Sequence, residues 1–269
     1  MSGIWQGDTR CVVMLGFDVD GVSSALNSNP DTAKLPSFMS MREYGPSVAA
    51  PRILDVLDKH DIKASFYIPG YVAETHETLV ADIADRGHEV AHHGYMHEAP
   101  ATLTPEQELE VLDRGSSVLE GITGQRVLGY RSPSWELSEY SIQYLIDRDF
   151  VYDSSLMGDD IPYVVTEGDS QLVEIPVHWE WDDHPYFSFA PALGGRSAMA
   201  SPDQVYQVWS AGFEGAYHYG RSFVLTMHPH IIGRPGRLRM LERLINYIKS
   251  MPGVEFRRAI DVANEWPNQ

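Results

Sequence analysis

Cysteine is nearly absent from this chain of 269 residues, whose single cysteine, Cys11, lies early in an apolar run. Structural zinc sites close all four metal positions with thiolate and imidazole ligands. One thiol cannot build such a site, so the composition argues against a structural zinc knuckle. The histidines and carboxylates are therefore the metal-binding groups to consider.

Basic side chains are also scarce. The chain has 20 lysines and arginines against 38 aspartates and glutamates, which gives a formal net charge of -18. A surface of this sign repels phosphates and anionic headgroups. We therefore expect no nucleic-acid or membrane partner, and anionic polymers are disfavoured as well.

Long hydrophobic runs are missing too. No stretch is long and apolar enough to span a bilayer, and residues 1–8 do not combine a basic region with an apolar segment. We therefore expect a cytoplasmic location. No linker, repeat or low-complexity tract divides the chain, so we expect one domain over residues 1–269, which is long enough to bury a substantial core.

Short apolar runs alternate with longer stretches of helical period, as in successive βα units. Two helices have strong start signals, because Thr104 and Ser201 each precede a proline and have a glutamine three residues later. Seven or eight such units predict an α/β barrel. The expected strands are residues 12–17, 63–68, 88–92, 126–130, 150–153, 172–178, 222–227 and 254–256.

Polar clusters follow several of these strands at their carboxyl ends. In an α/β barrel the loops at that end converge on one mouth, so residues far apart in sequence meet there. We therefore expect one shared site. The clusters are Asp18 and Asp20 after the first strand, His93 and His97 after the third, residues 131–135 after the fourth, and residues 228–230 after the seventh.

The histidine cluster has the spacing of a metal site. His93 and His97 lie four residues apart, and a carboxylate from a distant segment would close a third side of a divalent metal. The spacing alone is a weak signal, because 11 histidines produce it by chance. Asp18 and Asp20 share one side of an extended strand, and spacing does not decide which binds metal and which acts as a base. Asp18 has the alternative role of a solvated carboxylate capping the turn at Gly21.

These clusters carry a family resemblance. Residues 17–21, 93–97, 131–133 and 225–228 resemble the successive motifs of the polysaccharide deacetylase family, also called the NodB homology or carbohydrate esterase 4 domain. Val19 separates two aspartates that are adjacent in most carbohydrate deacetylases. That spacing, with residues 68–70 and 228–235, is similar to a branch of cyclic imidases, allantoinase-like enzymes and peptidoglycan-deacetylase-like proteins.

The resemblance implies a deformed (β/α) barrel that hydrolyses a non-peptide carbon–nitrogen bond with one divalent metal. Zinc is favoured, and cobalt, nickel and manganese are compatible. The same ligand types bind iron(II) in oxygenases, but that chemistry leaves the other motif residues without a role. The implied roles are metal ligation by Asp20, His93 and His97, general base for Asp18, general acid for His228, and support of the base by Arg131.

The substrate is less constrained than the chemistry. A cytoplasmic enzyme meets soluble metabolites, so a small linear or cyclic amide, imide or ureide is the first expectation. A glycan or peptidoglycan containing N-acetylglucosamine is the alternative, and a non-catalytic sugar-binding or scaffold module is a remote one. Residues 157–196 are expected to cover part of the mouth and to favour a closed pocket over a groove.

Several neighbouring residues are weaker candidates. Trp135, Trp181 and His230 are expected to contact substrate, and the aromatic and acidic stretch 178–187 suits a substrate wall or a contact within a homo-oligomer. Packing alone would explain that stretch equally well. By strand alternation His92 should point away from His93. Glu98 is expected either to hydrogen-bond a metal-bound histidine or to cap a helix.

Overall fold

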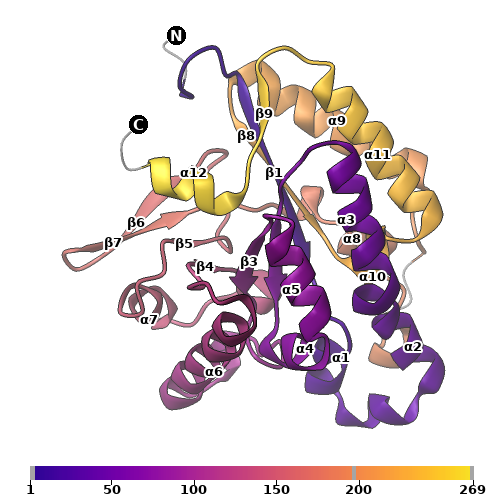
Figure 1. The fold of residues 1–269 in the computed structure, drawn as a ribbon, viewed down its shortest axis with the longest axis vertical. Coiled ribbons are helices and arrows are strands. Elements are labelled where there is room, and N and C mark those ends of the chain that lie inside the picture. Colours follow the sequence, from indigo (N-terminus) through magenta and orange to yellow (C-terminus); the bar gives the residue numbers. More distant parts are fainter. Residues whose placement is uncertain (1–3, 196–197, 267–269) are drawn as a thin grey trace.

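A mostly parallel sheet forms the centre of the protein. The computed structural model describes residues 4–195 and 198–266, and its sheet in these residues has nine strands (Figure 1). The strands are β1 (Cys11–Asp18), β2 (Ser65–Ile68), β3 (Glu89–His92), β4 (Gly129–Tyr130), β5 (Tyr152–Asp153), β6 (Tyr163–Glu167), β7 (Ser170–Glu174), β8 (Ser222–Met227) and β9 (Val254–Phe256).

Strand β1 has three partner strands in this sheet. It pairs in parallel with β2 and β9 and, over residues 12–17, with β8. All eight of its residues are buried, as expected of a strand covered on both faces. The remaining strands continue in the order β2, β3, β4, β5, β7 and β6. The carboxyl ends of the parallel strands therefore point to one side of the sheet.

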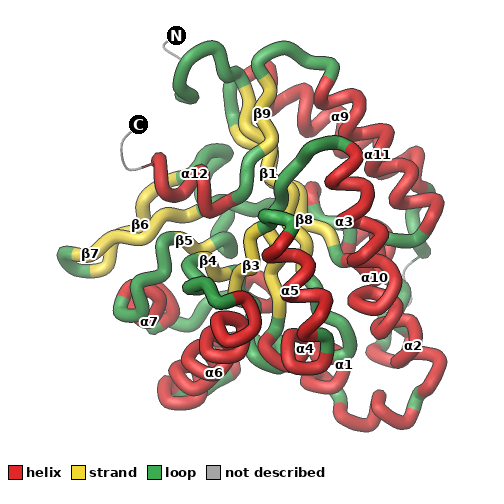
Figure 2. The backbone as a smooth tube through the Cα atoms, viewed as in Figure 1, coloured by secondary structure: helices red, strands yellow, loops and turns green. Residues whose placement is uncertain are grey.

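Helices connect and cover the strands (Figure 2). The two longest helices begin after Thr104 and Ser201, and each has a capping box, which confirms both predicted start signals. The helices are α1 (Ser23–Ser28), α2 (Pro36–Tyr44), α3 (Ala50–Lys59), α4 (Gly70–Thr75), α5 (Glu77–Asp85), α6 (Pro105–Thr123), α7 (Ser141–Ile146), α8 (His184–Phe187), α9 (Pro202–Tyr219), α10 (Pro229–Ile232), α11 (Pro235–Lys249) and α12 (Ala259–Glu265).

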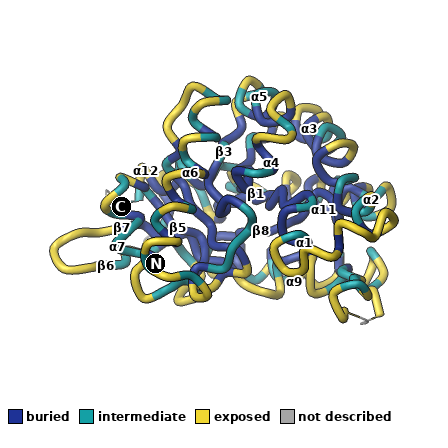
Figure 3. The backbone as a smooth tube through the Cα atoms, turned by 90° about the horizontal axis from the view of Figure 1, so that it is seen from below, coloured by how far each residue is buried: buried dark blue, intermediate teal, exposed yellow. Residues whose placement is uncertain are grey.

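The apolar faces of these helices and the sheet form the core. Buried residues gather around β1 and β8, whereas the helix exteriors and the β6–β7 turn are exposed (Figure 3). Helices α9 and α11 pack side by side against the β8 edge of the sheet (Figure 1). None of the helices in the described residues has the length and apolarity needed to cross a membrane.

The barrel is closed in an irregular way. Strand β6 was not expected from the sequence; it forms an antiparallel hairpin with β7 and projects from the edge of the sheet (Figure 1). Beyond β7 the chain runs to β8, where one isolated parallel bridge joins Asp182 to Thr226. This geometry agrees with the predicted deformed (β/α) barrel. The predicted cover 157–196 is described to residue 195, and within that part the residues that line the cavity all come after the hairpin: Trp179, Asp182, His184 and Leu193.

Helix α6 contains two glycines in opposite environments, which gives a matched test of this packing. A methyl group at Gly115 would overlap the His92 ring, whereas one at Gly121 would meet nothing within 4 Å. We expect Gly115→Ala to lower the free energy of unfolding by about 1–3 kcal/mol through overpacking. Gly121→Ala should raise it by about 0.5–1 kcal/mol through helix propensity. Urea denaturation of both variants checks this, and equal effects would contradict the packing described.

Candidate active site and metal centre

The first part of the site is the carboxyl end of β1. Asp18 is its last residue, and Asp20 follows after Val19, whose side chain is buried in the core. The two aspartates are 2% and 5% exposed and line the same cavity. The expectation that they share one side agrees with this arrangement. A solvated, turn-capping role for Asp18 does not, because its carboxylate is buried and paired with Arg131.

The second part is the turn after β3. His93 directly follows the strand, and His97 takes a left-handed backbone conformation with φ 64°. The Glu98 carboxylate accepts hydrogen bonds from the backbone amides of Tyr95 and Met96 at 2.9 and 2.8 Å. Glu98 therefore fixes the turn that carries both histidines, and it does not hydrogen-bond either ring among the described contacts. His92 points away from His93, as expected, and packs against α6.

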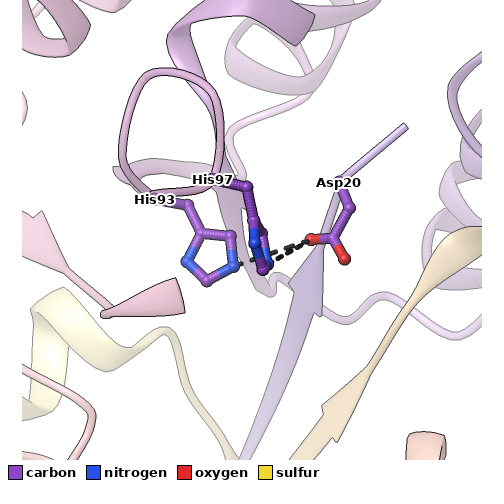
Figure 4. A group of neighbouring side chains, drawn as sticks. All are labelled: Asp20, His93 and His97. Carbon is purple, nitrogen blue, oxygen red and sulfur yellow. Dashed lines mark ion pairs between the residues drawn. The ribbon is translucent and has the colours of Figure 1, made fainter. Parts of the chain in front are cut away.

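Asp20, His93 and His97 converge on one point (Figure 4). Oδ1 of Asp20 lies 3.6 Å from Nε2 of each histidine. Ligands about 2.1 Å from a tetrahedral metal lie about 3.4 Å apart. Oδ1 is also buried without a hydrogen-bond partner among the described residues, a state that a bound cation would relieve. The three residues therefore fit a divalent metal.

The protonation states of these residues suit metal binding. Burial alone would raise the pKa of Asp20, but the neighbouring histidines, chiefly His97, outweigh burial and hold that pKa below its usual value. Burial lowers the pKa of His97 to about 4. At neutral pH the carboxylate is therefore ionised and the imidazole is neutral, as ligation requires.

Arg131 supports the site from within the barrel. Its guanidinium donates to Oδ1 of Asp18 at 2.8 Å and to the carbonyl and hydroxyl of Ser154 at 3.1 and 2.9 Å. The carbonyl of Arg131 accepts from Nδ1 of His93 at 2.7 Å. That hydrogen bond leaves Nε2 of His93 as the nitrogen available to a metal. One residue thus orients both Asp18 and His93.

His228 approaches the cavity from the end of β8. Its Nδ1 donates to Oδ1 of Asp183 at 2.7 Å, and its backbone amide donates to Oδ2 at 3.0 Å. Burial alone would lower the pKa of His228, but the ion pair and hydrogen bond with Asp183 outweigh it and hold that pKa well above the usual value. Burial also raises the pKa of the adjacent Asp182 to about 7. His228 is therefore held in its protonated form.

The cavity enclosed by these groups has a volume of about 240 Å³. Trp135 and Trp179 form an aromatic wall, with ring centroids 4.4 Å apart. Trp179, His184 and Leu193 come from the segment expected to cover the mouth, and all three line the cavity. The pocket is smaller than the volume of about 300–1,000 Å³ that is usual for ligand sites.

Two expected substrate contacts lie elsewhere. Trp181 does not line the cavity; its ring packs against Phe223 and against Gly212 of α9. The reason is the short 3-10 turn at Trp179–Trp181, which rotates successive side chains by about 120° and turns Trp179 to the cavity in its place. His230 is buried and does not line the cavity, and its Nε2 lies 2.7 Å from Nη1 of Arg42, which does.

Four residues of the site were missed by sequence reasoning: Asp183, Trp179, His184 and Arg42. The first three fall within the aromatic and acidic stretch 178–187, for which the sequence suggests a substrate wall, an oligomer contact or plain packing, without a role for these individual residues. Arg42 has no local signal, because it belongs to α2 and reaches the cavity only through the fold. Such contacts depend on tertiary structure and have no characteristic spacing.

The strand ends of this barrel bring together two histidines, a carboxylate, an arginine-bound aspartate and a protonated histidine. This combination is typical of hydrolases with a metal site. The family model for polysaccharide deacetylase matches residues 34–152. A peptidoglycan deacetylase of Helicobacter pylori is 32% identical, with 95% of this chain and 96% of that protein covered. This chain belongs to the polysaccharide deacetylase family, whose members hydrolyse carbon–nitrogen bonds, so the predicted family and enzyme class are confirmed.

Solved structures agree with this assignment. A candidate polysaccharide deacetylase of Mycobacterium smegmatis is 36% identical and superimposes with a TM-score of 0.96 over 100% of this chain and 94% of that one. An allantoinase structure has a TM-score of 0.87 over 98% of this chain and 93% of its own, at 22% identity. The similarity to the allantoinase concerns the fold alone. The two structures together confirm the predicted barrel class.

The two clusters of possible metal ligands give a direct test of the metal site. The second cluster is Asp182, Asp183 and His228, whose hydrogen bonds already satisfy it internally. We expect about one divalent ion per chain, most of which is lost in His93→Ala and retained in Asp183→Asn. Metal analysis after dialysis against a weak chelator provides the measurement. If Asp183→Asn loses the metal and His93→Ala retains it, the ion binds at the second cluster and the proposed site is wrong.

Proposed function

We propose that this chain is a metal-dependent deacetylase of an N-acetylated glycan, with peptidoglycan fragments as the leading substrates. The observation that carries the proposal is the convergence of Asp20, His93 and His97 beside Asp18 and His228 in a chain so similar to a named peptidoglycan deacetylase. The sequence had favoured a small amide, imide or ureide. The comparisons support the glycan alternative better.

The metal would be held by Asp20, His93 and His97, and we propose zinc. When bound, it supplies Lewis-acid chemistry that polarises the amide carbonyl and lowers the pKa of water. Ordinary amides are poor electrophiles, so this assistance suits the reaction. A cytoplasmic location and a homo-oligomer remain our predictions for the protein.

Asp18 is proposed as the general base. Arg131 occupies Oδ1 of its carboxylate, and Oδ2 lies 3.9 Å from Nε2 of His93, on the side of the metal ligands. Oδ2 would take a proton as water attacks the amide carbon. The buried guanidinium holds the carboxylate at this angle, which is the positioning role expected of Arg131.

His228 is proposed as the general acid. Its Nδ1 is engaged by Asp183, so Nε2 is the nitrogen free to serve the cavity that the residue lines. The leaving amine nitrogen must gain a proton when the carbon–nitrogen bond breaks. Imidazolium Nε2 would donate it, and the products would be acetate and a free amino sugar. Trp135 and Trp179 offer flat apolar faces on which a sugar ring packs.

A small amide remains a second candidate because of the cavity size. A volume of about 240 Å³ holds one small group and leaves no room for several sugars within the closed part. A glycan would therefore enter by one terminal or exposed residue. The same volume suits a cyclic imide or ureide.

The first experiment measures hydrolysis by metal-loaded protein of chitooligosaccharides and N-acetylated peptidoglycan fragments beside succinimide, hydantoin and allantoin. We expect acetate release from the glycans and a loss of about 10²–10⁴-fold in Asp18→Asn, the usual contribution of a general base. Hydrolysis of the cyclic compounds without acetate release from the glycans would favour the small-amide candidate. No hydrolysis of any compound by the metal-loaded protein would reject the catalytic proposal.

The pairing of His228 with Asp183 predicts a pH effect. A general acid must be protonated, so activity falls as pH rises through its pKa, and Asp183 moves that loss to higher pH by raising the pKa of His228. In Asp183→Asn the basic limb of the kcat/KM profile should move to lower pH. Glu180→Gln, at an exposed neighbouring position, is the control and should leave the profile in place. An unmoved basic limb in Asp183→Asn would contradict the assignment.

A further inference from the structure

Arg42 is a buried cation at the cavity that no catalytic role uses. Its side chain comes from α2, is only 6% exposed as a residue, and lines the cavity beside Asp20 and the metal ligands. Arginines are seldom buried without a carboxylate or phosphate partner. Among the described residues, no carboxylate forms an ion pair with this guanidinium, although Arg131 in the same site has Asp18.

The hydrogen bonds of Arg42 leave most of its donors unused. Nη1 lies 2.7 Å from Nε2 of His230. Burial lowers the pKa of His230 well below its usual value, so the ring is neutral and accepts this bond. Nε of Arg42 is buried with no partner within the described chain. His230 thus fixes the guanidinium without neutralising its charge.

Neighbouring charges do not compensate this cation. Burial lowers the pKa of Arg42, and Asp20 is the carboxylate that opposes the shift. The Asp20 carboxylate is also the one that the metal site requires. The charge of Arg42 is then left for an anion that enters the cavity.

A second polar group that lines the cavity lacks a hydrogen-bond partner among the described residues. The hydroxyl of Ser24, in α1, is buried, lines the cavity and makes no hydrogen bond to the described residues. A planar anion with two oxygens matches a guanidinium, which donates in a fixed fork, and a hydroxyl can donate to the same group. Unused buried donors are costly unless a ligand satisfies them.

We propose that Arg42 is a specificity residue that binds a carboxylate of the substrate close to the scissile amide. This inference rests on the proposed function and narrows its substrate class. N-acetylmuramic acid carries a lactyl ether on the ring carbon next to the one bearing the acetamido group, and this lactyl group ends in a carboxylate. N-acetylglucosamine has a neutral hydroxyl at that position. The enzyme should therefore favour muramic acid residues whose lactyl carboxylate is free, without a stem peptide, over glucosamine residues.

The test compares two probes that differ in charge alone: N-acetylmuramic acid and its lactyl carboxamide. Binding is measured by calorimetry on metal-loaded Asp18→Asn, in which turnover is suppressed. We expect the acid to bind about ten- to hundredfold more tightly than the carboxamide, the usual gain from a charged hydrogen bond. Adding Arg42→Gln should remove this preference, and Arg42→Lys should keep part of it.

A matched control separates recognition from structure. Arg52 lies nearby and donates to the Tyr44 hydroxyl at 2.9 Å and to the Gly233 carbonyl at 3.3 Å, but it does not line the cavity. Arg52→Gln should leave the preference for the acid unchanged. Metal content and melting temperature of each variant establish that the barrel is intact.

The possible outcomes distinguish this inference from the proposed function. A charge preference that survives Arg42→Gln, or no binding of the acid to intact protein, overturns the role of Arg42. Acetate release from both kinds of glycan without any charge preference leaves the deacetylase proposal standing and rejects the inference. A preference for the acid that depends on Arg42, without acetate release from any glycan, supports the carboxylate site and rejects the deacetylase proposal.

Discussion

The ion pair between Arg131 and Asp18 is the interaction on which the site depends. Arg131 follows β4 and Asp18 is the last residue of β1, two strands that are not neighbours in the sheet, and both residues are almost fully buried. Removing one partner of such a pair costs about 3–5 kcal/mol, because an uncompensated charge remains inside the protein. The guanidinium also lies over the Tyr67 ring, 3.8 Å from its centre, and close to Gly16. A larger residue than glycine at position 16 would meet the guanidinium.

This pair links the chemistry to the fold. Because Arg131 binds Asp18 through its side chain and His93 through its carbonyl, the proposed general base and one proposed metal ligand have a common support. A shift of β4 would disturb both at once. The opposite side of the cavity is organised separately, by the attachment of His228 to Asp183. The site therefore consists of two separately hydrogen-bonded halves that face each other across the cavity.

Strands with continuous apolar runs were predictable, and short or exposed ones were not. Predicted strand 12–17 corresponds to β1, but of 126–130 only Gly129–Tyr130 pairs, because the Val127 amide donates to the Glu120 carboxylate instead of to a neighbouring strand. Strand β6 escaped prediction because most of its residues are exposed and its pairing depends on β7 alone.

The residues of the motifs were predictable because each lies directly after a strand, where chain order alone sets its position. Asp20, His93 and His97 meet in space as their spacing suggested, although their roles as ligands stay predictions. The side chains of Trp181 and Trp179 point in different directions because of a short turn, and composition does not predict which of the two faces the cavity. Arg42 reaches the site through the packing of α2, which no sequence pattern predicts.

The single bridge between Asp182 and Thr226 has a consequence for how such an enzyme diversifies. The segment it anchors carries the partner of His228 and, through Trp179 and Leu193, part of the cavity wall. Insertions or substitutions there alter proton donation and pocket shape together, while the ligand strands stay untouched. Evolution could thus exchange one substrate for another by rebuilding this loop, with the proposed metal ligands inherited unchanged.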